Sequence, residues 1–200
     1  MFIAIVGFKG GVGKTTAAIH LAGYYQSLGR SVKVIDADPN RSAVRWFKRG
    51  ATLDFSVCDA MSASMLPPSD LSIIDSAARP SRDDLESLKQ CVAMILPTTP
   101  DTLGIEGLAQ TIATLQDLDY PNYWVLPNIC PPRPSTATPV TLDWLHSRNI
   151  PCLPPIRRFQ AYIHASAKGT LVRDSGDRYG KIAWSDYCNV GAQLTKGALS

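Results

Sequence analysis

Two lysines lie close together in a glycine-rich stretch near the start of the chain, Lys9-Gly10-Gly11-Val12-Gly13-Lys14-Thr15-Thr16. The apolar run before it, residues 2–6, is typical of a strand buried on both faces of a parallel sheet, and residues 15–28 have the apolar spacing of a helix. A glycine-rich turn between a strand and a helix lets backbone N–H groups converge on phosphate oxygens. The stretch therefore predicts a phosphate-binding loop, in which Lys14 contacts the β and γ phosphates and the Thr15 hydroxyl binds Mg²⁺.

The loop departs from the general pattern G-x-x-x-x-G-K-[ST] at its first position, where Phe8 replaces glycine, and it carries an additional lysine, Lys9. The form KGGxGKT[ST] closely resembles the deviant Walker A loop of the ParA/MinD family of ATPases. This resemblance implies that residues 10–16 bind ATP. It also implies that Lys9 reaches across a nucleotide-sandwich homodimer to the phosphates held by the other subunit. The alternatives are a chance glycine–lysine turn and a dinucleotide-binding fingerprint, which needs glycine where Thr16 stands.

Carboxylates follow two further apolar runs. Residues 31–35 lead into Asp36-Ala37-Asp38-Pro39, and residues 71–74 lead into Asp75. The carboxyl ends of parallel strands form the edge where α/β sheets bind ligands, so we expect these side chains near the loop. The simpler interpretation of the first motif is an Asp/Pro turn that caps the next helix.

The ParA/MinD resemblance assigns roles to these acids. D-x-D-P is the family's Walker A′ motif, in which Asp38 positions the attacking water and Asp36 helps to organise Mg²⁺. Asp75 corresponds to Walker B, a carboxylate directed towards Mg²⁺, usually through water. The segment after it, residues 76–80, departs from the D-x-P-[PG] continuation that is common in the family.

Weaker signals lie in the second half of the chain. By the same resemblance, Asn128 binds the adenine, although an asparagine at a strand end is equally often a turn former. Arg157 and Arg158 lie in a segment that resembles the family's I-P-R-x, and they are the candidates for contacts with a DNA phosphate backbone. From Arg148 onward the chain has eight basic residues against three acidic ones, which is either a DNA-facing surface or an ordinary solvated one.

The elements that must position these residues alternate between strands and helices. We expect a single domain, residues 1–200, with an α/β fold of the P-loop NTPase type: a doubly wound, mostly parallel sheet with helices on both faces. The expected strands are residues 2–6, 31–36, 53–57, 71–75, 91–97, 123–128 and 152–153. The expected helices are residues 15–28, 40–50, 82–90, 101 to about 118, 141–149 and 178–194, with an extended proline-rich connection over residues 129–139.

Composition narrows the class of protein. The chain has 200 residues, a net charge of +3 and no apolar run long enough to span a membrane. Five scattered cysteines without a C-x-x-C pair favour a reducing cytoplasm and argue against metal or iron–sulfur ligation. No basic leader precedes the first apolar run, so we expect no signal peptide.

The resemblance implies a small ParA-type, Mg²⁺-dependent ATPase. Such a protein forms an ATP-dependent homodimer, binds DNA without sequence preference, and partitions or positions a plasmid, chromosome or other cargo with a ParB-like or other cargo-bound adaptor. It would be cytoplasmic, nucleoid-associated when ATP is bound, and not membrane-bound. The alternatives are a metabolic ligase of the dethiobiotin synthetase type, a nucleotide-gated binding module, and a MinD-like division-site regulator, for which residues 191–200 offer too little apolar surface to bind a membrane.

Overall fold

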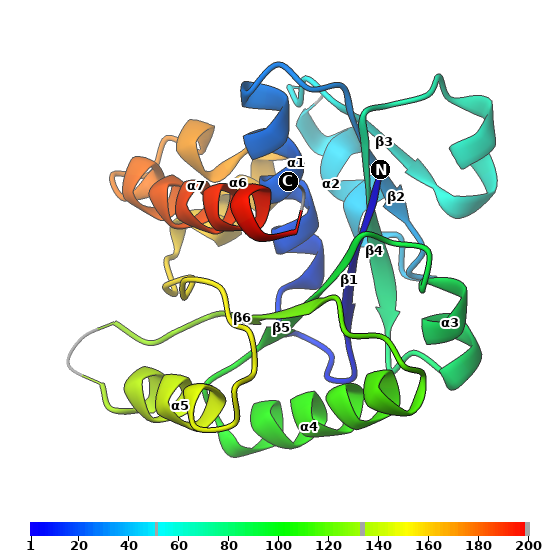
Figure 1. Ribbon diagram of the computed structural model, residues 1–200. Helices are drawn as coiled ribbons and strands as arrows, with labels where there is room; N and C mark the ends of the chain where they lie inside the picture. Colours follow the sequence, from blue (N-terminus) through cyan, green and yellow to red (C-terminus); the bar gives the residue numbers. More distant parts are fainter. Residues whose placement is uncertain (51, 133–134, 199–200) are drawn as a thin grey trace.

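The computed structural model describes residues 1–50, 52–132 and 135–198 (Figure 1). Six parallel strands form one sheet in the order β3-β2-β4-β1-β5-β6. They are β1 (Phe2–Gly7), β2 (Val32–Asp36), β3 (Ser56–Asp59), β4 (Leu71–Ala78), β5 (Ala93–Thr98) and β6 (Tyr123–Pro127). Because β1 is central and the chain winds outwards from it in both directions, the predicted doubly wound α/β fold is confirmed.

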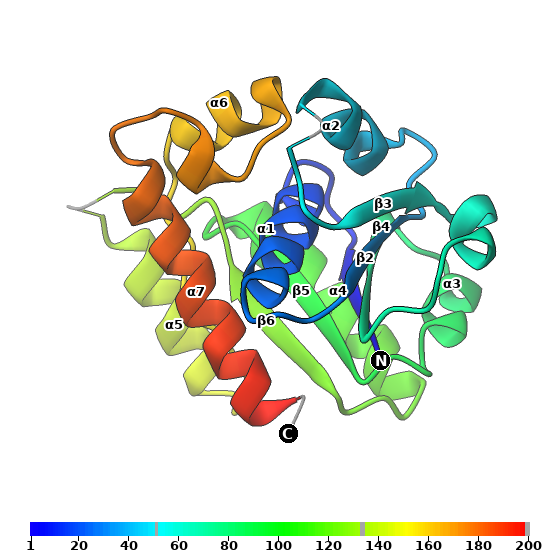
Figure 2. The ribbon, with the colours of Figure 1, turned by 90° about the horizontal axis from the view of Figure 1, so that it is seen from above.

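Helices cover both faces of this sheet (Figures 1 and 2). The α-helices are α1 (Lys14–Ser27), α2 (Ser42–Gly50), α3 (Arg82–Ser87), α4 (Thr102–Asp117), α5 (Ala137–His146), α6 (Ala161–Lys168) and α7 (Gly180–Gly197), and short 3₁₀ helices span η1 (Ala60–Met65) and η2 (Val172–Asp174). One apolar core lies between the sheet and α1, α2, α6 and α7, and the second lies under α3, α4 and α5. No helix of the described residues is long and apolar enough to cross a membrane.

Several predicted boundaries were wrong. Helix α5 begins four residues before the predicted start, with Pro139 in its first turn. Proline is tolerated there because the N–H groups of the first turn make no intrahelical hydrogen bond. Strand β3 lies at 56–59 rather than 53–57, and Cys152 makes one isolated bridge to Val125 instead of a strand. Helix α6 was not predicted at all. Pro134, in the predicted proline-rich connection, lies outside the described residues.

A buried histidine connects α1 to the segment that follows α6. His20 is fully buried, its Nδ1 donates to the Thr16 carbonyl (2.7 Å), and its Nε2 accepts the Val172 N–H (3.0 Å). Its ring stacks on Tyr187, with centroids 4.9 Å apart, and meets Tyr162 edge-on. Because both ring nitrogens have partners only in the neutral form, the fold requires His20 to be uncharged.

We expect acid to destabilise the protein through His20. Burial lowers the pKa of His20 from 6.5 to about 4, so between these two values the unfolded chain binds a proton that the folded one does not. The contribution of neutral His20 to the free energy of unfolding is therefore fully present above pH 6.5. It decreases by about 3 kcal/mol as the pH falls towards 4.

The variant His20→Phe tests this expectation because it keeps a ring and removes the titration. Its free energy of unfolding, measured in urea at pH 7.0, 5.5 and 4.5, should be lower than that of the wild type at pH 7, since the Val172 N–H loses its acceptor at a cost of about 1–3 kcal/mol. The difference should shrink as the pH falls. Parallel pH profiles of the two proteins would show that His20 does not cause the acid sensitivity.

Candidate nucleotide-binding site

The glycine-rich loop lies between the carboxyl end of β1 and the first turn of α1, as predicted. Gly11 and Gly13 have φ angles of 78° and 85°, in the left-handed region that glycine adopts without strain. Gly13 is the N-cap of α1. Among the residues that the structure describes, no side chain caps this helix, and its first turn holds no acid. The N–H groups at the positive end of α1 therefore remain available to an anion, as a phosphate site requires.

The loop and β4 meet directly. The Thr15 hydroxyl donates a 2.7 Å hydrogen bond to Oδ2 of Asp75, which confirms that the loop lies against this strand. The strand extends three residues beyond Asp75, where the sequence predicted that it would end. Within the described part of the chain, the other oxygen of Asp75, Oδ1, is buried and accepts no hydrogen bond. Burial raises the pKa of Asp75 to about 7, and burial also lowers the pKa of Lys14, against the opposing influence of Asp75 and Asp38.

These residues fit a divalent cation. A buried carboxylate oxygen without a donor, next to a hydroxyl group, is an incomplete electrostatic arrangement that a cation would complete. Mg²⁺ prefers oxygen ligands of this kind and commonly shares them with the phosphates of a nucleotide. Thr15 and Asp75 are thus the residues of this chain placed to hold it.

Asp36 lies directly opposite Asp75 in the β2–β4 register. Its Oδ1 accepts the N–H of Asp38 (3.2 Å), and its Oδ2 accepts the N–H of Val44 in the first turn of α2 (3.0 Å). Asp38 is partly exposed, and its Oδ1 accepts two hydrogen bonds from Asn40. Asp36 therefore caps the start of α2, as the simpler interpretation of the motif predicts. Both acids nevertheless lie at the ligand-binding edge of the sheet.

The additional lysine of the loop is held within its own chain. Lys9 Nζ donates to Oδ1 of Asp101 (2.9 Å) and to Oγ1 of Thr99 (3.3 Å). Asp101 is also the N-cap of α4, where the same oxygen accepts the Gly104 N–H (2.8 Å). Asp101 was not predicted as part of this site. An aspartate directly before a helix is a recognisable cap, but its contact with a lysine 92 residues away is not readable from spacing.

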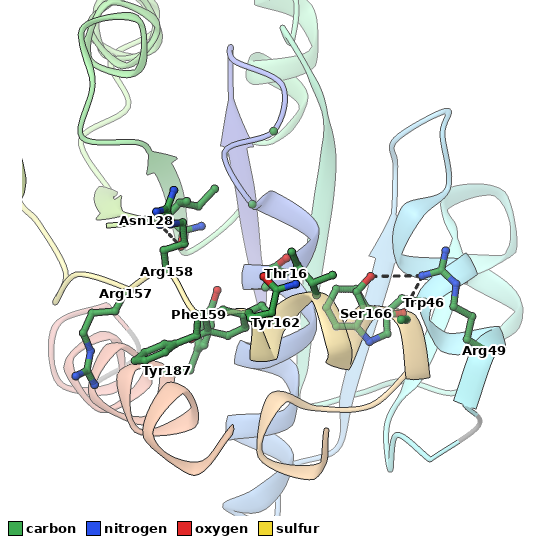
Figure 3. A pocket seen from close by; sticks show the side chains of 16 residues that line it. Thr16, Trp46, Arg49, Asn128, Arg157, Arg158, Phe159, Tyr162, Ser166 and Tyr187 are labelled. Atoms are coloured by element: carbon green, nitrogen blue, oxygen red, sulfur yellow. Dashed lines mark hydrogen bonds between the residues drawn. The ribbon is translucent and has the colours of Figure 1, made fainter. Parts of the chain in front are cut away.

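A cavity of about 1060 Å³ opens beside the loop (Figure 3). Gly11, Gly13 and Thr16 line it on one side, and Asn128 and Ile129 follow from the end of β6. The remaining lining comes from the segment before and within α6, from α2 and from α7, and comprises Trp46, Arg49, Arg157, Arg158, Phe159, Gln160, Tyr162, Ile163, Ser166, Ala167 and Tyr187. Its walls combine the aromatic side chains of Trp46, Phe159, Tyr162 and Tyr187 with several polar and charged groups, as in many small-molecule sites.

Asn128 is hydrogen-bonded to the glycine-rich loop. Its Nδ2 donates to the Val12 carbonyl (2.7 Å), and its Oδ1 accepts the Ile129 N–H (2.9 Å). A Cβ on Gly13 would collide with the Asn128 amide, so the two residues fit closely. The structure thus gives Asn128 a contact with the phosphate loop that the sequence did not predict.

The two candidate DNA-binding arginines differ in their surroundings. Arg157 makes a bidentate ion pair with Asp186 of α7, with Nη2 2.7 Å from Oδ1 and Nε 3.1 Å from Oδ2. Its charge is therefore balanced within the chain. Arg158 is exposed, and within the described residues no carboxylate lies within 4.0 Å of it.

A phosphate loop between β1 and α1, with carboxylates from β2 and β4 at the same sheet edge, defines a P-loop nucleotide-binding fold. The sequence profile of the CobQ/CobB/MinD/ParA nucleotide binding domain matches residues 3–172, and the chain belongs to this family. The resemblance to ParA/MinD proteins that the loop and its acids predicted is confirmed.

Individual relatives span nearly the whole chain. The maintenance of carboxysome distribution protein A of Gloeobacter kilaueensis is 28% identical over 203 residues, covering 97% of this chain and 94% of that protein. Apo McdA of Cyanothece has the same fold, with a TM-score of 0.78 at 17% identity, covering 100% of this chain and 99% of that one. The septum site-determining protein MinD of Pyrococcus horikoshii, solved with Mg-ADP, gives a TM-score of 0.71 at 16% identity, covering 98% of this chain and 96% of that one.

Proposed function

We propose that this protein is a Mg²⁺-dependent ATPase of the ParA type, built as a single ATPase domain over residues 1–200. It forms an ATP-dependent sandwich homodimer, binds DNA without sequence preference, and partitions or positions a plasmid, chromosome or other cargo together with a ParB-like or other cargo-bound adaptor. One observation carries this proposal: Lys14 and Thr15 lie next to Asp75 at one edge of the sheet. They belong to a glycine-rich loop whose first residue is Lys9.

The proposed chemistry rests mainly on positioning and charge. Lys14 contacts the β and γ phosphates, and residues 10–16 bind the phosphate chain through backbone N–H groups. Asp38, which lies partly exposed after β2, orients the attacking water. Thr15 and Asp75 hold Mg²⁺, which neutralises phosphate charge when bound, and Asp36 fixes the turn that carries Asp38.

Lys9 acts from the other subunit in this proposal. In the single chain its ammonium group is bound to Asp101 and Thr99, so it must leave these partners to reach phosphates across a dimer interface. A partly exposed ion pair of this kind contributes only about 0–1 kcal/mol. Charge-assisted hydrogen bonds from Lys9 to triphosphate oxygens would be stronger and would replace it.

The relative named for carboxysome distribution supports a positioning role, because the chain spans 94% of its length. We propose a cytoplasmic protein that associates with the nucleoid when ATP is bound and that does not use a membrane.

Binding to a random-sequence DNA duplex tests the proposal. With ATP and Mg²⁺ we expect tight binding that weakens steeply as salt increases, since phosphate contacts release counterions. With ADP we expect little binding. Absence of binding in both nucleotide states would contradict the partition function and favour the metabolic ligase alternative, in which the cavity takes a small-molecule substrate.

The variant Asn128→Ala separates two roles of this residue. If Asn128 supports the loop through Val12, its loss weakens binding of ATP and of inorganic tripolyphosphate to a similar extent, by about 1–3 kcal/mol. If it also recognises adenine, ATP loses more affinity than tripolyphosphate does. Calorimetric titration of both ligands measures the difference. Unchanged affinity for both ligands would remove Asn128 from the site.

A further inference from the structure

Helix α2 has one face buried in the core and the other covered with positive charge. Ala43 and Trp46 are 0% and 4% exposed, whereas Arg45, Lys48 and Arg49 lie on the outside. No acidic residue occurs in this helix. Across the described residues, no carboxylate lies within 4.0 Å of any of these three cations. We call these three residues the α2 basic face.

The α2 basic face is held firmly by its neighbours. Trp46 Nε1 donates to the Thr170 carbonyl (3.1 Å), and Arg49 Nη1 donates to the Ser166 carbonyl (2.8 Å), a contact drawn as a dashed line in Figure 3. The backbone of Gly50 approaches that of Gly169 so closely that a Cβ on either would collide with the other. The three charges are therefore presented on a helix that cannot easily turn away from solvent.

This face is also connected to the nucleotide site. Asp36 accepts the Val44 N–H at the start of α2, and Arg49 lines the same cavity as Thr16. In Figure 2, α2 and α6 lie side by side at the end of the molecule where α1 begins, and α2 also packs on α1. Any change in the turn that carries Asp36 and Asp38 thus acts directly on the first turn of this helix.

The chemistry of the face selects its partner. A membrane surface is disfavoured because the apolar side of α2 is already used in the core, which leaves no side chain to insert between lipids. A protein partner usually requires an aromatic or aliphatic anchor, and α2 has no large exposed hydrophobic residue. Arginine and lysine at i, i+3 and i+4, with no carboxylate paired to them in the described part of the chain, fit the repeated phosphates of a nucleic acid backbone.

We propose that the α2 basic face, Arg45, Lys48 and Arg49, binds the phosphate backbone of DNA. This inference rests on the proposed function and moves the DNA-binding surface from the Arg157 segment, where Asp186 balances one of the two charges, to a helix joined to the nucleotide site. Arg158, exposed at the other side of the same cavity, extends the surface.

The double variant Arg45→Gln/Lys48→Gln tests the inference, because within the described residues neither side chain donates a hydrogen bond and both are exposed. The control is Arg82→Gln/Lys89→Gln on and just after α3, which removes the same charge from the opposite face of the sheet together with one exposed 3.3 Å hydrogen bond from Arg82 Nη2 to the Asp117 carbonyl. Binding to a random duplex with ATP and Mg²⁺ is measured over a salt series. ATP affinity and thermal melting should be unchanged in both variants.

For the α2 variant we expect the slope of log K against log salt to become smaller by about 2, one for each lost phosphate contact, while the control keeps the wild-type slope. Wild-type slopes in the α2 variant, or equal losses in both variants, would overturn the inference and leave the proposed function intact. No binding by the wild type would overturn both. Loss of binding to phosphatidylglycerol vesicles, with DNA binding unchanged, would also overturn it.

Discussion

Lys14→Ala is expected to weaken ATP binding strongly. Lys14 is 8% exposed, and its ammonium group lies close enough to Asp75 and Asp38 for both to raise its pKa against the effect of burial. Removing it eliminates the main positive charge for the phosphates and leaves these acids to repel them. Loss of one partner of a buried charged contact costs about 2–5 kcal/mol, which is roughly a 30- to 4,000-fold increase in the Kd.

Titration calorimetry with ATP and Mg²⁺ measures this effect, and Lys9→Ala is the matched control. Lys9 belongs to the same loop, but its contacts are with Asp101 and Thr99 and not with Asp75. The Lys9 variant should therefore bind ATP as a monomer and fail to form the ATP-dependent dimer. Tight ATP binding by Lys14→Ala would remove the assignment of the loop as a nucleotide site.

Asp38→Ala is expected to stop hydrolysis while ATP binding and ATP-dependent dimers remain. Asp38 lies at the end of β2 without a direct bond to Thr15 or Asp75, so its loss leaves the phosphate loop and the proposed Mg²⁺ residues in place. Removal of a group that positions or deprotonates the attacking water costs about 10²–10⁴-fold in rate. Phosphate release and light scattering with ATP measure the two properties separately.

Asp38→Asn separates the charge of Asp38 from its role in the turn. An asparagine oxygen still accepts the Asn40 N–H and preserves the local structure. If the carboxylate is needed for the water, Asp38→Asn is as inactive as Asp38→Ala. If Asp38→Asn restores turnover, Asp38 acts only through the turn. Normal turnover by Asp38→Ala would place the catalytic group elsewhere.

The local features of the fold could be predicted from the sequence because each depends on neighbours along the chain. The apolar runs before Lys9, Asp36 and Asp75 identify strands, and parallel strands bring their carboxyl ends to one edge by geometry alone. The 2.7 Å contact between Thr15 and Asp75 confirms this expectation. The order of the motifs also led to the family, which the profile match over residues 3–172 confirms.

The errors have local physical reasons as well. Helix α6 is eight residues long and follows two prolines and an extended segment, so little periodic pattern is available to indicate it. Its stability comes from packing on α2 and η2 rather than from its own sequence. The early start of α5 was not predicted because a proline such as Pro139 is typical of extended chain, although it is also accepted in a first helical turn.

The sequence by itself determined the class of protein, the phosphate loop with Lys14 and Thr15, and the edge at which Asp36, Asp38 and Asp75 lie. Only the tertiary structure decided what each side chain contacts: Lys9 with Asp101, Asn128 with Val12, and Arg157 with Asp186. These pairs are 92, 116 and 29 residues apart, so no short-range pattern encodes them. They arise because folding brings distant parts of the chain together: the first two pairs join loops at one edge of the sheet, and the third joins the segment before α6 to the middle of α7.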